Sequence, residues 1–190
     1  RRYMNDLFLT VYIAPRGFEH ELAAELARKR QSVLEQRGRL FLCKGSPVSL
    51  AWAQNVWFEP RFLSVRSIKD AAFQLKNLQR NWALHESACR DGTRRRAALI
   101  EKALPHVSRK PLIFGAPLPD APLGAWTMGE ADCILASPRC ASRFADGEVF
   151  FEENKKEPPN RAYLKLWEAF TLLPQRPGPG ERCLDMGACP

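Results

Sequence analysis

Several segments of the chain have the dense apolar pattern of strands that pack into a sheet. Early in the sequence these segments are 7–14 (LFLTVYIA), 38–43 (GRLFLC) and 61–67 (RFLSVRS). Two more follow at 131–137 (ADCILAS) and 147–151 (GEVFF), after a proline- and glycine-rich stretch at 111–126 that predicts a loop. The range 7–14 is therefore predicted as the first strand.

Between these segments, apolar residues recur at helical spacing. In 18–30, Phe18, Leu22 and Leu26 form one stripe, and the basic residues fall in the last turn, where the helix dipole favours cations. Further helices are predicted at 47–58, with Pro47 near its start, at 68–84, around 94–102 and at 160–170. In 68–84 the residues expected to face inward are Ile68, Ala72, Leu75 and Trp82. Strands that alternate with helices predict an α/β or α+β sandwich with helices on one face of a sheet.

A charged run with paired prolines, EENKKEPPN at 152–160, interrupts this alternation. Such a composition is typical of a linker between domains. We therefore expect two parts, one at 1–152 and a second at 153–190.

The net charge of +8 comes from 29 Lys and Arg against 21 Asp and Glu. The excess is concentrated in 28–39, 66–80 and 90–102, and a positive potential of this kind attracts polyanions, of which nucleic acid is the commonest in the cytosol. A solvated basic surface explains the charge equally well. The candidate RNA-binding residues are Arg28, Lys29, Arg30, Arg94, Arg95 and Arg96.

Cysteine spacing and hydropathy limit the class of protein. The six cysteines are scattered without a Cys-x-x-Cys pair, which argues against a zinc site and leads us to expect no bound metal. Cys133 and Cys140 could meet across a turn, but buried free thiols of a cytoplasmic protein are the favoured interpretation. No apolar run reaches the roughly 18 residues that a membrane span requires.

The last two segments carry the candidate chemistry. The helix at 160–170 begins with Asn160, a good N-cap; Leu164, Trp167 and Phe170 form its core stripe, and Lys165 lies on a neighbouring face. The stretch ERCLDMGACP (181–190) has the pattern of a strand that leads into a glycine-bearing loop, which suits a nucleotide-like ligand. Alone, the loop is equally consistent with a structural turn, and a lone lysine is usually a surface residue.

Taken together, PPNRAYLKLWEAF and the CLDMGACP that follows resemble the FtsJ-like ribose 2′-O-methyltransferases. In that family an Arg-Ala-x-x-Lys-Leu-x-Glu helix precedes an Asp-x-Gly-Ala-x-Pro-Gly-Gly-Trp loop that holds S-adenosylmethionine. Within the family, the spelling Leu-Asp-Met-Gly-Ala-Cys-Pro is most similar to enzymes that methylate a cytidine of 23S rRNA. The segment PRGFEHELAAEL (15–26) is similar to the segment that opens those enzymes.

The resemblance implies a fold, a cofactor and a set of site residues. The region 1–152 would be an RNA-binding part, ferredoxin-like and THUMP-like, and 153–190 would be the start of a Rossmann-like methyltransferase domain. Lys165 matches the first lysine of the family's catalytic Lys-Asp-Lys-Glu tetrad. The residues that match cofactor contacts or stand beside them are Ala162, Asp185, Gly187, Ala188, Cys189 and Pro190. The implied activity is methyl transfer from S-adenosylmethionine to a ribose 2′-hydroxyl of 23S rRNA, without a metal.

The sequence also departs from the family pattern. Asn160 stands where the family has serine, and the glycine pair, the tryptophan and the three other members of the tetrad do not follow in this sequence. The chain alone is therefore expected to be an inactive, truncated part of a methyltransferase. Two alternatives remain open: a non-catalytic RNA-binding module, and a methyltransferase of the same fold that acts on tRNA or on protein.

Overall fold

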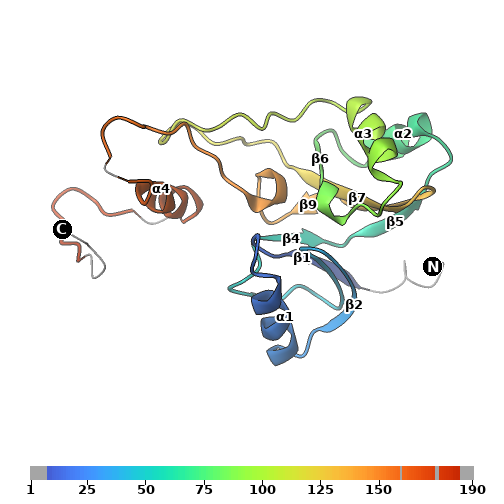
Figure 1. Ribbon diagram of the computed structural model, residues 1–190, viewed down its shortest axis with the longest axis horizontal. Helices are drawn as coiled ribbons and strands as arrows, with labels where there is room; N and C mark the ends of the chain where they lie inside the picture. Colours follow the sequence, from blue (N-terminus) through green and yellow to red (C-terminus); the bar gives the residue numbers. More distant parts are fainter. Residues whose placement is uncertain (1–7, 159, 174–175, 185–190) are drawn as a thin grey trace. The chain divides into compact units, whose positions relative to one another are not determined.

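The computed structural model describes residues 8–158, 160–173 and 176–184 (Figure 1). The chain divides into two compact units, which we call unit 1 (Arg1–Arg109 and Pro119–Glu148) and unit 2 (Lys110–Leu118 and Val149–Pro190). The division into domains at residue 152 stays a prediction.

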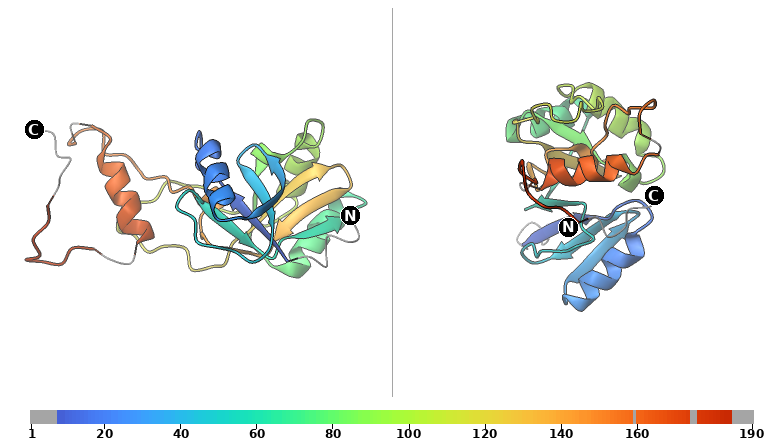
Figure 2. Two further views of the ribbon diagram at one scale, coloured as in Figure 1. Left: turned by 90° about the horizontal axis from the view of Figure 1, so that it is seen from below. Right: turned by 90° about the vertical axis from the view of Figure 1, so that its left-hand side faces the viewer.

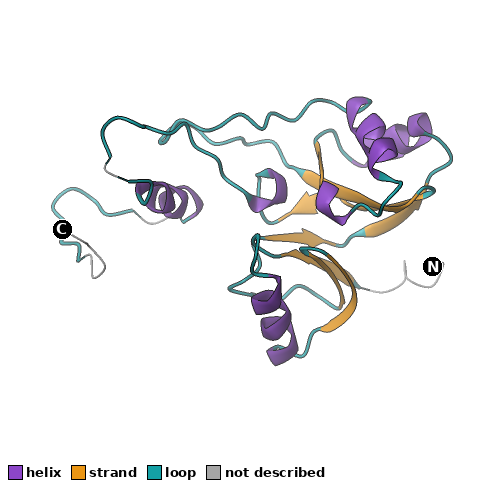
Figure 3. Ribbon diagram, in the orientation of Figure 1, coloured by secondary structure: helices purple, strands orange, loops and turns teal. Residues whose placement is uncertain are grey.

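Unit 1 contains two sheets (Figure 3). The first has the strand order β2-β3-β1-β4-β9 and is antiparallel throughout. Its strands are β1 (Leu9–Ile13), β2 (Ser32–Arg37), β3 (Leu40–Lys44), β4 (Asn55–Phe58) and β9 (Arg139–Cys140). The second has the order β5-β8-β7-β6, with only β6 and β7 parallel. Its strands are β5 (Arg61–Ser64), β6 (Trp82–Leu84), β7 (Gly124–Glu130) and β8 (Cys133–Ser137).

The two sheets and three helices of unit 1 form four layers (Figure 2). Helix α1 (Glu19–Arg28) covers the outer face of the first sheet, while α2 (Ile68–Leu78) and α3 (Arg94–Lys102) cover the outer face of the second. The sheets pack against each other through a shared apolar cluster that includes Val11, Trp57 and Leu135. The fold is therefore mixed α/β, as predicted, and helices cover one face of each sheet. The second sheet that covers the other face was not predicted.

Burial on both faces explains the dense apolar pattern of the strands. In β1, Val11 and Ile13 belong to the cluster between the sheets, whereas Tyr12 belongs to the cluster under α1. A strand covered on both sides needs apolar residues at successive positions, and each fully buried large side chain contributes about 1.5–3 kcal/mol.

The helix predicted at 47–58 is absent, because this segment makes its hydrogen bonds with α1 and β1 instead. The amides of Ala51 and Trp52 each donate to the Glu25 carboxylate over 2.9 Å, and the amide of Val48 donates to the Tyr12 hydroxyl. Residues 47–53 are irregular, and 55–58 form β4 beside β1.

The helix predicted at 68–84 ends at Leu78, six residues early. Gln79 adopts an extended conformation, and the Trp82 indole N–H donates to the carbonyls of Leu75 and Gln79. Trp82 therefore satisfies the Gln79 carbonyl, which a longer helix would have bonded to a backbone amide. The next residues, 82–84, form β6 against β7.

Two further strand expectations need correction. Residues 147–151 do not form a strand, because Asp146 and Gly147 have φ values of 58° and 77°, which turn the chain sharply. They end the 3-10 turn η3 (Ala145–Gly147), and Phe151 makes only an isolated bridge to Leu112. Conversely, β2 was not predicted, because its sequence lacks the dense apolar pattern of the other strands. Its charged residues and little burial are typical of an edge strand.

Unit 2 is built on helix α4 (Tyr163–Leu172). Trp167 stacks on Phe114, with ring centroids 4.7 Å apart and an angle of 4°, and also contacts Phe151 and Tyr163 edge-on. The helix begins at Tyr163, three residues after Asn160, which was predicted as its N-cap. The Asn160 side chain instead accepts a hydrogen bond from the Ala162 amide. No residue of α4 is fully buried among the residues described, so the predicted core stripe is only half-buried.

Residues 181–184 of the predicted final strand have no regular structure. A strand needs a neighbour for its ladder of hydrogen bonds, and the described part of unit 2 offers only the single bridge at Phe151. The remaining residues of that predicted strand and its loop lie outside the described ranges.

Candidate functional site

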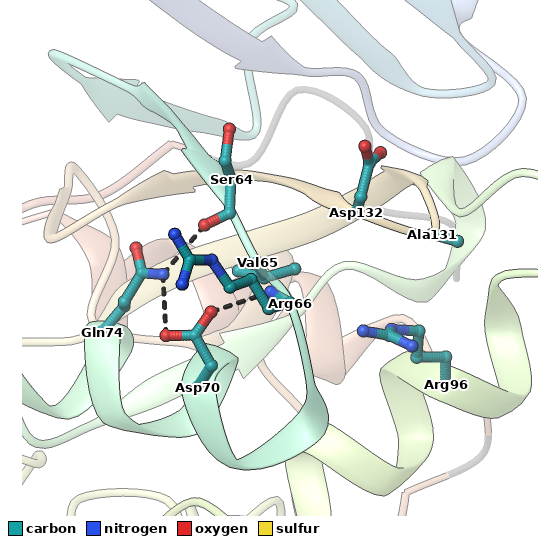
Figure 4. Close-up of a pocket in the computed structure, with 8 residues that line it drawn as sticks. All are labelled: Ser64, Val65, Arg66, Asp70, Gln74, Arg96, Ala131 and Asp132. Atoms are coloured by element: carbon teal, nitrogen blue, oxygen red, sulfur yellow. Dashed lines mark hydrogen bonds between the residues drawn. The ribbon is translucent and has the colours of Figure 1, made fainter.

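One pocket of unit 1 lies between the starts of α2 and α3. The pocket has a volume of about 580 Å³, and Figure 4 shows the side chains that form it. They come from the end of β5, the first turns of α2 and α3, and the turn between β7 and β8. The lining residues are Ser64, Val65, Arg66, Asp70, Gln74, Arg96, Ala131 and Asp132.

The start of α2 is fully capped within this pocket. Ser67 Oγ accepts a hydrogen bond from the Asp70 amide, and the Asp70 carboxylate accepts from the Arg66 amide at 2.8 Å and from Gln74 Nε2 at 3.1 Å. The hydrogen bond from the Arg66 amide, with those from Gln74 and the nearby Arg66 charge, holds the pKa of Asp70 below its ordinary value. Asp70 is thus an ionised carboxylate whose bonding capacity is used within the protein.

The start of α3 has the opposite character. Arg94, Arg95 and Arg96 occupy its first turn, where no acidic residue is present, and Thr93 makes no capping bond with its side chain. The Thr93 hydroxyl donates instead to the carbonyls of Arg90 and Met128. The positive end of the helix dipole and three guanidinium groups therefore coincide, an arrangement that disfavours the free helix and favours a bound anion.

The two arginines of the pocket have spare donors. Within the described part of the chain, neither Arg66 nor Arg96 forms a side-chain hydrogen bond or an ion pair, and Arg96 Nε is buried without a partner. In Figure 4, Arg96 extends from α3 toward α2, while the Asp132 carboxylate is directed away from both guanidinium groups.

The exposed face of α2 adds an aromatic ring beside the pocket. Phe73 is 64% exposed, and Lys69 and Lys76 flank it at positions i−4 and i+3 of the same helix. Phe73 was not among the candidate RNA-binding residues of the sequence analysis. The sequence does indicate that Phe73 is exposed, because Phe73 lies between two lysines and outside the inward stripe of Ala72 and Leu75.

The structure separates the predicted RNA-binding residues into two groups. Arg94 and Arg95 are exposed at the start of α3, and Arg96 lines the pocket. Arg28, Lys29 and Arg30 are exposed at the end of α1, in the layer on the opposite side of unit 1 (Figure 2). One flat surface cannot contact both groups, and the role of each stays a prediction.

The predicted catalytic and cofactor residues belong to unit 2. Lys165 is exposed on α4, and Ala162 is exposed just before the helix begins. They lie three residues apart, which places them on the same side of a helical turn. Asp185, Gly187, Ala188, Cys189 and Pro190 lie outside the described residues, so the structure neither assembles nor contradicts the predicted cofactor loop.

Sequence reasoning also missed a partly buried polar network that joins Ser87, His85 and Asp146. His85 Nδ1 lies 2.6 Å from Asp146 Oδ1, and Ser87 Oγ lies 2.9 Å from His85 Nε2. The order of these groups is that of a Ser–His–Asp triad. Because the side chain of His85 has no exposed surface and packs edge-on against Trp57, we interpret the network as a structural link.

The described residues set limits on other classes of site. Across the described ranges, no group of three or more His, Cys, Asp or Glu residues could hold a metal ion. Cys133 and Cys140 lie in different sheets, and no disulfide joins them. None of the helices within those ranges combines the length and apolar character needed to cross a membrane.

Comparisons with known proteins find similarity among solved structures but none in sequence. No protein-family model matches the sequence, and no curated protein matches it. Among solved structures, the chain is similar to the crystal structure of a possible methylase from Clostridium difficile 630, with a TM-score of 0.39 and 12% identity. The match covers 68% of this chain and 40% of that one, so this chain spans less than half of that protein's length.

Proposed function

We propose that this chain is the RNA-binding part, with the first elements of the catalytic domain, of an S-adenosylmethionine-dependent methyltransferase that methylates a ribose 2′-hydroxyl of 23S rRNA. The observation that carries the proposal is the placement of Lys165. It is an exposed lysine on α4, three residues after Ala162, and the Leu-Asp-Met-Gly-Ala-Cys-Pro segment follows it in the chain.

The residues of this chain suit that chemistry in two ways. The small side chains of Gly187 and Ala188 would let backbone amides approach S-adenosylmethionine closely. S-adenosylmethionine would supply the methyl group and a sulfonium leaving group. The ammonium of Lys165 would favour the oxyanion that develops on the ribose as the hydroxyl loses its proton. The other tetrad members are not in this sequence, so we assign methyl transfer to the product of the whole reading frame.

Unit 1 would supply the affinity for RNA. The uncapped, arginine-rich start of α3 and the pocket beside it offer guanidinium groups without partners among the described residues. Contacts of this kind with phosphates give binding that weakens as salt rises.

The test is methyl transfer by the product of the whole open reading frame that contains this sequence. Incubation with 23S rRNA and S-adenosylmethionine labelled in the methyl group should place the label on ribose, in a linkage that alkali does not cleave. Lys165→Ala should lower the rate by about 10²–10⁴-fold, as loss of a catalytic group does. Lys155→Ala, a change of an equally exposed lysine outside the motif, serves as the control and should leave the rate unchanged.

Label on a base or on protein would contradict the ribose assignment and favour a methyltransferase with another substrate. Binding of RNA without any binding of S-adenosylmethionine would favour a non-catalytic RNA-binding module. An unchanged rate in Lys165→Ala would remove Lys165 from the mechanism.

A further inference from the structure

We propose that the pocket between α2 and α3, together with Phe73, is a binding site for single-stranded RNA: the pocket holds one phosphodiester, and Phe73 stacks on an adjacent unpaired base. The inference rests on the proposed function for the choice of RNA as the partner. It adds which part of unit 1 binds RNA and which form of RNA binds there.

The start of α3 supplies the first argument. Three arginines in the first turn of a helix oppose its dipole, and Thr93 leaves the turn without a side-chain cap. A phosphate placed there would accept hydrogen bonds from free amides and pair with the guanidinium groups at the same time. The three arginines therefore destabilise the start of α3 in the unbound protein. A bound anion would remove this destabilisation.

The pocket itself supplies the second argument. Arg66 and Arg96 reach it from different elements, and the described residues provide neither side chain with a hydrogen bond or an ion pair. Of the two carboxylates in the lining, Asp70 is already bonded to the Arg66 amide and to Gln74. The Asp132 carboxylate points away from both guanidinium groups (Figure 4). The charged donors that remain available in the pocket are thus the two guanidinium groups.

Phe73 supplies the third argument. An aromatic ring that is 64% exposed contributes little to the core, and the lysines on either side of it attract phosphates. Phe73 lies three residues after Asp70 of the pocket, about 4.5 Å further along the helix axis, so one strand can reach both. Stacking of a base on an exposed ring with basic neighbours is the usual mode of single-strand binding.

This geometry favours an unpaired strand over a duplex. The bases of a duplex are stacked on each other and cannot stack on a protein ring without being extruded. A duplex would contact the arginines alone, and Phe73 would then have no effect on its affinity.

The experiment measures binding of a fluorescently labelled single-stranded RNA oligonucleotide to the 190-residue chain by anisotropy over a series of salt concentrations. Arg66→Ala and Arg96→Ala should each weaken binding about tenfold. Each should also reduce the slope of log K against log salt by about 0.7, the value for one phosphate contact on a single strand. Lys44→Ala, in the other sheet, is the control for loss of an exposed cation and should change affinity less than twofold.

Phe73→Ala should weaken single-strand binding about tenfold and leave the salt slope unchanged, because stacking releases no counterion. Phe73→Trp should restore the affinity. Phe8→Ala removes a phenylalanine that is 77% exposed elsewhere on unit 1 and is the matched control. Circular dichroism of each variant establishes that it is folded. Because Arg66 is exposed, Arg66→Ala is the variant whose fold is least affected by the substitution.

Unchanged affinity in the Arg66→Ala/Arg96→Ala double variant would overturn the proposal, as would equal losses for single strand and duplex in Phe73→Ala. Inorganic phosphate that saturates the pocket without being displaced by RNA would assign the site to free phosphate instead. Binding of polyglutamate as tight as that of RNA would assign it to an acidic protein. Failure of methyl transfer with these binding effects intact would refute the proposed function alone.

Discussion

The Nδ1 atom of His85 lies 2.6 Å from Oδ1 of Asp146, although 61 residues separate them along the chain. Burial of Asp146 alone would raise the pKa of its carboxyl, but the hydrogen bond from His85, with the charges of His85, Arg39 and Arg109, lowers it below the ordinary value. An ionised carboxylate can only accept, so Nδ1 of His85 carries the proton. This bond ties the end of β6 to the turn η3.

The first prediction concerns the charge of Asp146. Asp146→Asn keeps a residue that tolerates the φ of 58° but removes the carboxylate, and it should lower the free energy of unfolding by about 1–3 kcal/mol near pH 7. Because the folded-state pKa is depressed, this stabilisation is present above the ordinary pKa of 3.8 and is lost as the pH falls through the folded value.

Urea denaturation between pH 3 and 7 measures this difference. The difference between the wild type and Asp146→Asn should be largest at neutral pH and shrink below about pH 4. Asp91→Asn, at an exposed position, is the control. A difference that stays constant across the whole pH range would show that the carboxylate charge is not responsible.

The second prediction concerns Gly147, which follows Asp146. Its φ is 77°, and a Cβ atom added there would lie 2.3 Å from the carbonyl oxygen of Gln54. Gly147→Ala should therefore combine backbone strain with a steric clash and lower the free energy of unfolding by about 2–5 kcal/mol.

Gly17→Ala is the matched control, because Gly17 has a φ of 80° and no atom within 4 Å of an added Cβ. It should cost only the strain of the left-handed conformation, about 1–2 kcal/mol. Thermal unfolding of both variants measures the comparison, and equal losses would mean that the segment 145–148 moves to relieve the clash.

The third prediction concerns Glu25, the α1 residue that holds the segment 47–53. Burial would raise the pKa of Glu25, but the bonds from the Ala51 and Trp52 amides, with the charges of Arg28 and Lys29, lower it. Glu25→Ala should leave both amides without their acceptor and cost about 1–3 kcal/mol. Glu25→Gln keeps one acceptor oxygen and should cost less.

Hydrogen exchange gives the local measurement for Glu25. The amides of Ala51 and Trp52 should exchange faster in Glu25→Ala, while those of α3 should keep their protection. Because the pKa of Glu25 is depressed on folding, its contribution is present above the ordinary value of 4.5 and is lost as the pH falls through the folded value. Unchanged exchange at Ala51 would contradict the role assigned to Glu25.

The fourth prediction concerns thiol reactivity. Burial raises the pKa of Cys43 to about 11 and that of Cys140 to about 12, whereas Cys183 is exposed. Because the thiolate is the reactive form, iodoacetamide at pH 8 should modify Cys183 well before Cys43 or Cys140 in the folded protein. Peptide mass spectrometry follows the three sites, and denaturant should remove the difference. Early modification of Cys43 in the native protein would contradict its burial under α1.

Local patterns predicted several elements of unit 1 correctly. The stripe of Leu22 and Leu26 predicted α1, and both side chains are buried. The apolar runs at 7–14 and 38–43 predicted β1 and β3, and the helix around 94–102 was found as α3. Each of these segments has a period that matches its final structure, so neighbours along the chain suffice to define it.

Local sequence patterns predicted only part of the candidate site. The clusters 66–80 and 90–102 were both recognised as basic, but nothing in the sequence shows that Arg66 and Arg96 line one pocket. That proximity follows from the packing of α2 and α3 on the same face of the second sheet. The exposure of Phe73 likewise depends on which face of α2 the sheet covers.

The sequence by itself determined which segments are apolar enough to be buried and where most helices begin. Only the tertiary structure decided that 47–58 and 82–84 are not helical, because Glu25, Tyr12 and the strand β7 supply hydrogen-bond partners from distant parts of the chain. The same holds for the four-layer arrangement. The apolar sequence of a strand indicates that its faces are buried. Whether a helix or a second sheet buries them depends on contacts between residues far apart in sequence.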